Sequence, residues 1–222
     1  MKLQFLDFMV ECGALLFGDF TLKSGRKSPY FVNTGEYKFN RQIGRLGDFY
    51  AQLIEKSKVE FDVLYGPAYK GIPLAVITAD RLKRNVGVAF NRKEEKNYGD
   101  GKAILGYVPK AGDRVAIIED VTTAGTSVRE TLDILGEDVK VAALYISIDR
   151  MEKGTGDISA VQQIEQEYSI PVFSIATARD IIDYLGEGNQ YTVKMKEYLN
   201  LYGVTADPAV ESPASPGVGY KN

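Results

Sequence analysis

The strongest constraint on the fold is a pattern that occurs twice, in which a short apolar run, a glycine-containing turn, a helical stretch and another apolar run follow one another. The first unit leads from the apolar run 61–65 to 86–90, and the second leads from 114–118 to 141–148. Short runs that are apolar on both faces are typical of parallel strands covered by helices. The sequence therefore predicts an α/β fold with an open, mainly parallel sheet flanked by helices.

The segments before and after these units predict further helices and a strand. Apolar residues recur at helical spacing over 6–17 and again over 43–54, which predicts two amphipathic helices. Residues 20–35 combine Ser, Gly, Pro and basic residues with a short apolar run, which predicts a turn followed by a strand. After the second unit, the pattern predicts a helix, a strand and two more helices.

These elements predict one main domain over 1–206, with a small hood built mainly from 1–40. Residues 207–222 are rich in Pro, Gly and Ser and carry almost no large apolar side chains, so we expect a flexible tail. No segment resembles a signal peptide or approaches the roughly 20 apolar residues that cross a bilayer. We therefore expect a soluble, cytoplasmic protein with no membrane partner.

Composition excludes several kinds of active site, because the chain contains no histidine. Without imidazole it cannot form a Ser-His-Asp or Cys-His hydrolase centre, an HExxH protease site or a histidine-bound zinc or iron site. The one cysteine, Cys12, cannot form an internal disulfide, which fits a reducing compartment. A net charge of −3 is too balanced to indicate a nucleic-acid partner, so any anion site must be local.

The segment that follows the apolar run 114–118 is the most informative about chemistry. Two carboxylates, Glu119 and Asp120, end the run, and small or hydroxylated residues then open a helix: Thr122, Thr123, Ala124, Gly125, Thr126 and Ser127. Hydroxyls and unpaired amides at a helix start suit a phosphate dianion. The acids would repel that phosphate unless they face sugar hydroxyls or a hydrated Mg²⁺. This combination indicates a ribose 5-phosphate site, and an ordinary capped helix with solvated acids is the alternative.

Two other loops carry basic residues at the ends of predicted strands. Glycines flank Lys70 in the loop 66–71, where exposed amides and one ammonium can bind a second anion; a simple Gly-Pro turn with a surface lysine is the alternative. The loop 91–101 is polar and closed by glycines, as in a lid that a polyanion orders, and it contains Arg92, Lys93 and Lys96. A solvated run of mixed charges is the alternative here.

The segment IIEDVTTAGTS closely resembles the phosphoribosyl pyrophosphate (PRPP) signature of type I phosphoribosyltransferases. Three further segments narrow this resemblance to the orotate phosphoribosyltransferases, namely FTLKSGRKSPYFVNTG (20–35), GPAYKGIPLA (66–75) and FNRKEEKNYGDG (90–101). The similarity extends from the first predicted helix to about Val204. It implies Mg²⁺-dependent transfer of ribose 5-phosphate from PRPP to orotate, which gives orotidine 5′-monophosphate and pyrophosphate in de novo pyrimidine biosynthesis.

The resemblance also implies a role for each matching loop. In the family, the loop matching 66–71 contacts pyrophosphate, here through Tyr69 and Lys70, and the peptide bond before the tyrosine can be cis. The loop matching 91–101 closes over the active site of the neighbouring subunit, so its cations would act in trans within a homodimer. The residues expected to be catalytic are Lys70, Arg92, Lys93, Lys96 and Asp120.

The substrate contacts implied by the resemblance fall into two groups. Residues 122–127 would anchor the 5′-phosphate, while Glu119 and Asp120 would hold the ribose hydroxyls and contact, through water, the Mg²⁺ that arrives with PRPP. The expected orotate contacts are Lys23, Phe31, Thr123 and Arg150. From the pattern alone, Phe31 could instead pack in the core and Arg150 could form a salt bridge, and we expect surface roles for Arg26 and Lys27.

Two other functions stay open at this stage. A purine phosphoribosyltransferase would use the same phosphate loop, although Lys23, Phe31 and Arg150 favour an anionic pyrimidine. A non-catalytic PRPP-binding regulator on the same fold would need the phosphate loop but not the cations of the lid.

The lid contains the clearest departure from the family pattern, because Tyr98 stands where relatives commonly have histidine. Tyrosine carries no positive charge near neutral pH, and pyrophosphate is a good leaving group once cations neutralise it. We predict that Tyr98→Phe lowers kcat by less than about 10-fold, below the gain typical of general acid–base catalysis. Steady-state kinetics would contradict this if turnover were abolished while PRPP affinity stayed intact.

Overall fold

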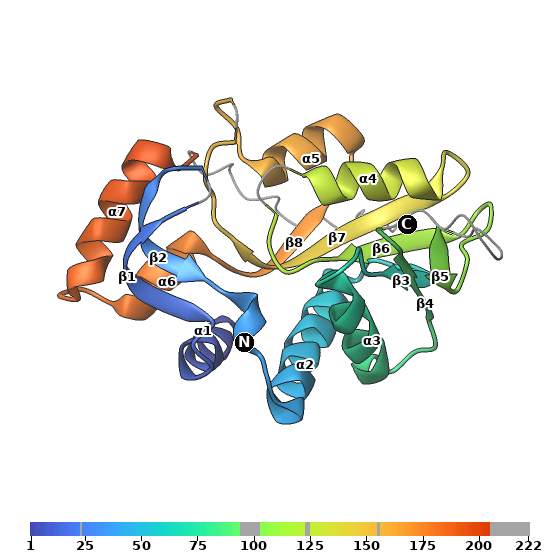
Figure 1. The fold of residues 1–222 in the computed structure, drawn as a ribbon, viewed down its shortest axis with the longest axis horizontal. Helices are drawn as coiled ribbons and strands as arrows, with labels where there is room; N and C mark the ends of the chain where they lie inside the picture. The colour runs from blue at the N-terminus through green and yellow to red at the C-terminus, as the bar shows by residue number, and fades with distance from the viewer. Residues whose placement is uncertain (23, 94–102, 123–124, 155, 205–222) are drawn as a thin grey trace, which may run out of the picture.

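A six-stranded sheet forms the centre of the computed structural model, which describes residues 1–22, 24–93, 103–122, 125–154 and 156–204 (Figure 1). Its strands, in the spatial order β5-β4-β3-β6-β7-β8, are β3 (Val63–Tyr65), β4 (Gly87–Asn91), β5 (Ile104–Gly106), β6 (Arg114–Ile118), β7 (Lys140–Asp149) and β8 (Val172–Thr177). All neighbouring strands pair in parallel except β4 and β5, which are antiparallel. The predicted open, mainly parallel sheet is confirmed.

Helices cover both faces of this sheet, which explains why its strands are apolar on both sides. The helices α2 (Asn40–Ser57) and α3 (Gly71–Arg81) lie on one face, and α4 (Thr126–Leu135) and α5 (Ala160–Tyr168) lie on the other (Figure 1). On β7, Leu144 and Ile146 pack in one cluster with Val128 of α4 and Ile164 of α5. The neighbouring Tyr145 belongs to the larger core, which includes Phe49 of α2.

A second, two-stranded sheet forms the hood at one end of the molecule. The hairpin of β1 (Leu15–Thr21) and β2 (Lys27–Val32) packs against α1 (Lys2–Glu11) and α7 (Gln190–Tyr202), and α6 (Ala178–Leu185) contacts both of these helices (Figure 1). The ring of Tyr30 in β2 meets that of Tyr198 in α7 edge-on, with 6.3 Å between the centroids. The last helix therefore supports the N-terminal hairpin, and a short 3₁₀ turn (Thr34–Glu36) leads from the hood to α2.

The first helix is shorter than its apolar spacing predicts. It ends at Glu11, and Gly13 follows with a φ of 72°, in the left-handed region that glycine adopts without strain. The chain turns there into β1, where Phe17 stacks on Tyr191 of α7 at a centroid distance of 5.7 Å. The prediction that the helical stripe continues through Gly13 and Phe17 is wrong, because a strand can bury the same apolar residues against the hood. The strands β1 and β5 were not predicted.

Two other expectations concern membrane-spanning helices and the C-terminal tail. Across the described ranges, no helix combines the length and the apolar character needed to cross a membrane. The tail predicted over 207–222 lies outside the residues that the structure describes.

Candidate active site

The candidate active site lies between β3 and β6, the two neighbouring strands from which the chain crosses to opposite sides of the sheet. From β3 the chain crosses through α3 to β4, whereas from β6 it crosses through α4 to β7 on the opposite side. Because β3 and β6 are parallel neighbours, the loops after their carboxyl ends begin side by side, as at ligand sites of open α/β sheets. The first loop is tightly folded, since a Cβ on Gly66 would collide with the carbonyl of Gly71. The loop 66–70 and, after β6, residues 119–122 and Gly125 therefore form one candidate site.

Asp120 holds a network of polar groups between these loops. Its Oδ2 accepts hydrogen bonds from Lys70 Nζ at 2.8 Å and from Thr34 Oγ1 at 2.6 Å. The Lys70 side chain is 63% exposed, whereas that of Asp120 is 10% exposed. The exposed ammonium of Lys70 thus pairs with the buried carboxylate of Asp120. Because exposed ion pairs contribute little free energy, this ammonium can move toward an anionic ligand at a small cost in free energy. Sequence reasoning predicted Lys70 and Asp120 but missed Thr34, which comes from the connection between the hood and α2.

Glu119, like Asp120, is a buried carboxylate, at 8% exposure. Burial raises the pKa of its carboxyl to about 7, and the charge of Asp120 adds to the rise. A hydrogen bond from Ser127 and the charges of Lys70 and Lys93 oppose it. This carboxyl can therefore change protonation state near neutral pH, and ligand hydroxyls that donate to it would favour its ionised form.

The start of α4 has the features of an anion site. Its N-cap, Gly125, adopts a left-handed φ of 65° and is buried, while Thr126 is exposed in the first turn. The hydroxyl of Thr122 is buried, and within the described part of the chain it has no hydrogen-bond partner. A free hydroxyl and the unpaired first amides of α4 fit phosphate oxygens. Thr123 and Ala124 lie outside the described residues.

A cavity of about 670 Å³ brings several predicted residues together beside this helix start. Phe31, Thr122, Thr126 and Arg150 all line it, so the predicted phosphate contacts and the predicted base contacts share one space. Lys70 and Asp120 instead border an adjacent cavity of about 220 Å³, together with residues of α2 and α3. The predicted contacts thus divide between two neighbouring cavities at the same end of the sheet.

Arg150 follows β7 and forms the basic wall of the larger cavity. Its guanidinium lies over the ring of Tyr30, with Cζ 4.2 Å from the centroid, and Nη2 donates to Ser28 Oγ at 3.3 Å. Phe31 lies on the opposite β-strand face from Tyr30 and stacks on Phe20 at 5.5 Å. A flat aromatic face and a guanidinium therefore border the same cavity, as a planar anionic ligand requires.

Arg26 departs from its predicted surface role. It is half-buried, lines the larger cavity and places Nη1 3.5 Å from Oε2 of Glu152. Its guanidinium also lies over the ring of Tyr202 at 5.0 Å. The prediction for Arg26 is wrong because α7, remote in sequence, covers this side of the hairpin, whereas Lys27 is exposed as expected.

The loop after β3 presents its tyrosine to the outside. Tyr69 is 58% exposed, follows a cis peptide bond from Ala68, and lies under Lys93 Nζ at 5.4 Å from its ring centroid. The buried Asn91, which the sequence analysis missed, accepts a hydrogen bond from the Ala68 amide through Oδ1 at 2.8 Å. Asn91 ends β4 directly before Arg92, so one residue links the loop after β3 to the start of the predicted lid.

Several predicted site residues cannot be placed. Lys23, Thr123, Ala124, Lys96 and Tyr98 lie outside the described residues. Of the predicted lid cations, Arg92 and Lys93 are described, and Arg92 donates its amide to the Ala103 carbonyl at 3.0 Å.

The acidic pair fits a divalent cation that arrives with a ligand. Within the described residues, no group of three or more His, Cys, Asp or Glu side chains is arranged to hold a metal ion. Mg²⁺ commonly binds through one or two carboxylates together with substrate phosphates and water. Glu119 and Asp120 match this donor set, so they could contact Mg²⁺ once phosphate oxygens supply the remaining ligands.

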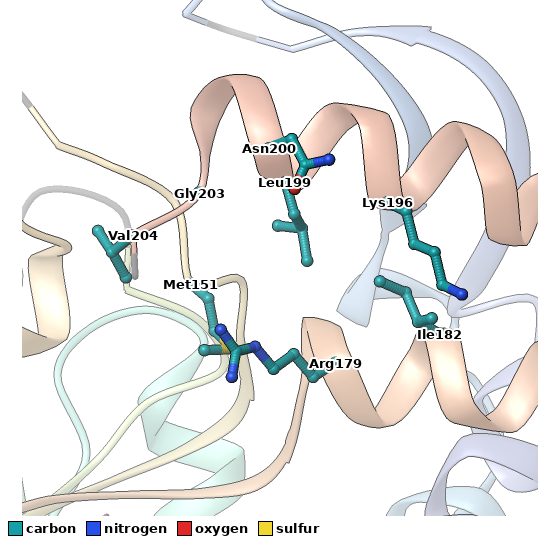
Figure 2. A pocket seen from close by; sticks show the side chains of 8 residues that line it. All are labelled: Met151, Arg179, Ile182, Lys196, Leu199, Asn200, Gly203 and Val204. Atoms are coloured by element: carbon teal, nitrogen blue, oxygen red, sulfur yellow. The ribbon is translucent and has the colours of Figure 1, made fainter. Parts of the chain in front are cut away.

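A further cavity of about 320 Å³ lies behind the wall of the larger one. Met151 lines both cavities and separates them. Figure 2 shows Arg179 extending from the start of α6 toward Met151, while Leu199 points into the space from α7. The segment after β7 therefore has the candidate site on one side and the helices α6 and α7 on the other.

Comparisons with known proteins agree with this geometry. A family model described as phosphoribosyl transferase domain matches residues 33–181. The chain is 46% identical to an orotate phosphoribosyltransferase of Lachnoclostridium phytofermentans, over 92% of this chain and 98% of that protein. It is 49% identical to one of Clostridium beijerinckii, over 83% and 85% respectively. A crystal structure of the Francisella tularensis orotate phosphoribosyltransferase superimposes with a TM-score of 0.80 at 40% identity, covering 90% of this chain and 99% of that one.

The raised pKa of Glu119 predicts a pH-dependent effect on stability. Between pH 4.5 and about 7 the folded carboxyl keeps a proton that the unfolded one loses, so this group's contribution falls as pH rises through that window. Because Gln resembles the protonated form, Glu119→Gln should raise the Tm at pH 8 by about 2–4 °C. The difference should vanish at about pH 4, below the unfolded pKa of 4.5.

The measurement is thermal melting without Mg²⁺ or PRPP, with Glu130→Gln on the exposed side of α4 as the control. If Glu119→Gln lowered the Tm equally at both pH values, the carboxyl would be structurally required in its ionised form, contrary to this account.

Proposed function

The chain belongs to the orotate phosphoribosyltransferase family, and from this premise we propose that it transfers ribose 5-phosphate from PRPP to orotate through the site described above. The products are orotidine 5′-monophosphate and pyrophosphate, as in pyrimidine biosynthesis. One observation carries this proposal: a helix start with unpaired amides, a pair of carboxylates and a buried guanidinium meet at one edge of the sheet. The high identity to orotate-specific relatives favours this function over a purine phosphoribosyltransferase or a PRPP-binding regulator.

The start of α4 anchors the substrate by its 5′-phosphate. Thr122, Thr126 and Ser127 supply hydroxyls around the unpaired amides of the first turn, and Thr123, Ala124 and Gly125 complete this loop. The positive end of the helix dipole favours a dianion at this point. Glu119 and Asp120 lie at the end of the adjoining strand, where they accept hydrogen bonds from the ribose hydroxyls. This arrangement fixes the sugar so that its C1 faces the base cavity.

Departure of pyrophosphate is assisted by cations from two loops. Lys70 and Tyr69 contact it from the loop after β3, and Arg92, Lys93 and Lys96 approach from the lid. Mg²⁺ bound with PRPP would neutralise part of the leaving group's charge, with water-mediated contacts to the acidic pair. The bond from ribose C1 to a pyrophosphate oxygen breaks, a bond from C1 to a ring nitrogen of orotate forms, and the departing pyrophosphate takes up the proton of that nitrogen.

The base cavity holds orotate between an aromatic surface and a guanidinium. Phe31 packs against the flat ring, and Arg150 binds the carboxylate, with Lys23 and Thr123 as further contacts. The positive charge that develops on the ribose during transfer is stabilised by the nearby carboxylates rather than by a covalent intermediate.

We also propose a cytoplasmic homodimer in which the lid of each subunit closes over its neighbour's site. The unpaired thiol of Cys12 is compatible with a reducing compartment.

The substrate assignment predicts loss of orotate absorbance when the purified chain is mixed with PRPP and Mg²⁺. Uracil and hypoxanthine should react at least about 100-fold more slowly, because neither supplies a carboxylate to the buried guanidinium. Turnover of hypoxanthine in place of orotate would indicate a purine phosphoribosyltransferase. Tight PRPP binding without any turnover would indicate a regulator.

The proposal that the lid acts in trans predicts complementation between two inactive variants. Lys96→Ala removes a lid cation and Asp120→Asn removes a carboxylate of the site that receives the lid, so each alone should lose about 100-fold or more in turnover. Co-expressed with different tags, they should form heterodimers with one intact site. Activity should then recover to about a quarter of the wild-type value for random pairing. Preparations no more active than either variant alone would show that each lid serves its own subunit.

A further inference from the structure

We propose that Glu152 is a positioning residue for the base, because it holds Arg150 and Arg26 in place so that one edge of the Arg150 guanidinium faces the cavity. This inference rests on the proposed function, since the group to be recognised is the carboxylate of orotate. The sequence analysis gave Glu152 no role.

The contacts of Glu152 join two guanidiniums at the cavity wall. Its Oε1 lies 2.8 Å from Nε and 2.6 Å from Nη2 of Arg150, and its Oε2 lies 3.5 Å from Nη1 of Arg26. The side chains of Arg150 and Glu152 are only 11% and 12% exposed. Charge-assisted hydrogen bonds in such a poorly solvated place are stronger than surface ion pairs.

The contacts of Arg150 with Glu152 and Ser28 do not use its Nη1 atom. Nε and Nη2 are used by Glu152 and Ser28, and the ring of Tyr30 covers one face of the guanidinium. The Tyr198 hydroxyl also interacts with this guanidinium. Because guanidinium geometry is planar and rigid, fixing Nε and Nη2 also fixes the direction of Nη1. The carboxylate of a planar ligand in the cavity would meet a donor that is already oriented.

The backbone around Glu152 is fixed by the end of α7. Glu152 pairs with Gly203 in an isolated β-bridge, Lys153 donates its amide to the Tyr202 carbonyl at 2.8 Å, and Val204 donates to the Met151 carbonyl at 2.9 Å. Met151 itself has a φ of 55°, and its amide donates to Asp149 Oδ1 at 2.8 Å. The carboxylate is therefore mounted on a segment tied to the hood rather than on a free loop.

If Glu152 acted through its charge alone, its removal would strengthen the binding of an anionic base, whereas a positioning role predicts weaker binding. The cavity is lined by two acidic side chains, Asp149 and Glu152, and by four basic ones, Arg26, Arg129, Arg150 and Lys153. Loss of the Glu152 charge would make this wall more positive and would strengthen attraction of an anionic base. If Glu152 serves mainly to orient Arg150, its loss should instead weaken binding, because a poorly aimed guanidinium bonds the carboxylate less well. The direction of the change therefore separates the two roles.

The test compares Glu152→Gln and Glu152→Asp with the wild-type chain by calorimetry. Affinity for orotidine 5′-monophosphate, which contains the base, is measured beside affinity for ribose 5-phosphate, which lacks it. We expect Glu152→Gln to weaken orotidine 5′-monophosphate binding by about 10- to 100-fold, the range for a charge-assisted hydrogen bond. Ribose 5-phosphate binding should change by less than about 2-fold. Glu60→Gln, which breaks the exposed pair with Arg84, is the matched control and should change neither affinity.

Glu152→Asp keeps the charge but shortens the reach to both guanidiniums. A positioning role predicts weakened binding of orotidine 5′-monophosphate in this variant as well, whereas a role through charge alone predicts the wild-type value. Unchanged or tighter binding of orotidine 5′-monophosphate in Glu152→Gln would overturn the inference. An equal loss for both ligands in the two variants would also overturn it, since that result indicates a structural defect.

Turnover of orotate by the wild-type chain is measured separately. Absence of that turnover would refute the proposed function, while the difference between the two ligands would still decide whether Glu152 positions Arg150. Wild-type turnover together with unchanged binding in the variants would refute only the role of Glu152.

Discussion

The parallel pairing of β3 with β6 is the constraint on which the whole site depends. Val63, Leu64 and Tyr65 stand opposite Val115, Ala116 and Ile117, and all six side chains are fully buried. This register brings the loop 66–70, to which we assign pyrophosphate binding in our proposal, and the acidic pair to the same edge of the sheet. Buried hydrogen bonds then fix the acidic loop, because Tyr50 donates to the Glu119 carbonyl and Ser147 donates to the Asp120 carbonyl, both at 2.6 Å. Packing of the core thus determines where the charged groups meet.

Charge is balanced locally, although the chain as a whole is only weakly acidic. On one side of the site, the exposed ammonium of Lys70 compensates the carboxylate of Asp120. On the other side, the carboxylate of Glu152 compensates the buried guanidinium of Arg150. In our proposal the cation of each pair, Lys70 or Arg150, is the group that meets an anionic part of the substrate. The pairs also limit the cost of burying these ions before the substrate arrives.

Much of the fold could be predicted because its signals are local in sequence. Apolar runs followed by glycine-containing turns identified the parallel strands, and the small residues after Asp120 identified the start of α4. The first helix was predicted too long because helical spacing cannot distinguish a helix from a strand that buries the same residues beyond Gly13. The contacts of Arg26, Asn91 and Glu152 could not be predicted, because each depends on a partner brought close by the tertiary fold. The available signals were a polar side chain at the end of β4 for Asn91 and the charged segment that follows β7 for Glu152.

A crystal structure with orotidine 5′-monophosphate bound would test the central claim most directly, that one edge of the sheet holds phosphate, ribose and base in fixed positions. The account predicts the 5′-phosphate at the start of α4, the ribose hydroxyls on Glu119 and Asp120, and the base carboxylate on Nη1 of Arg150. In that complex Glu152 should still hold Nε and Nη2 of Arg150. A base carboxylate bound elsewhere, with Arg150 turned away from the ligand, would contradict the account.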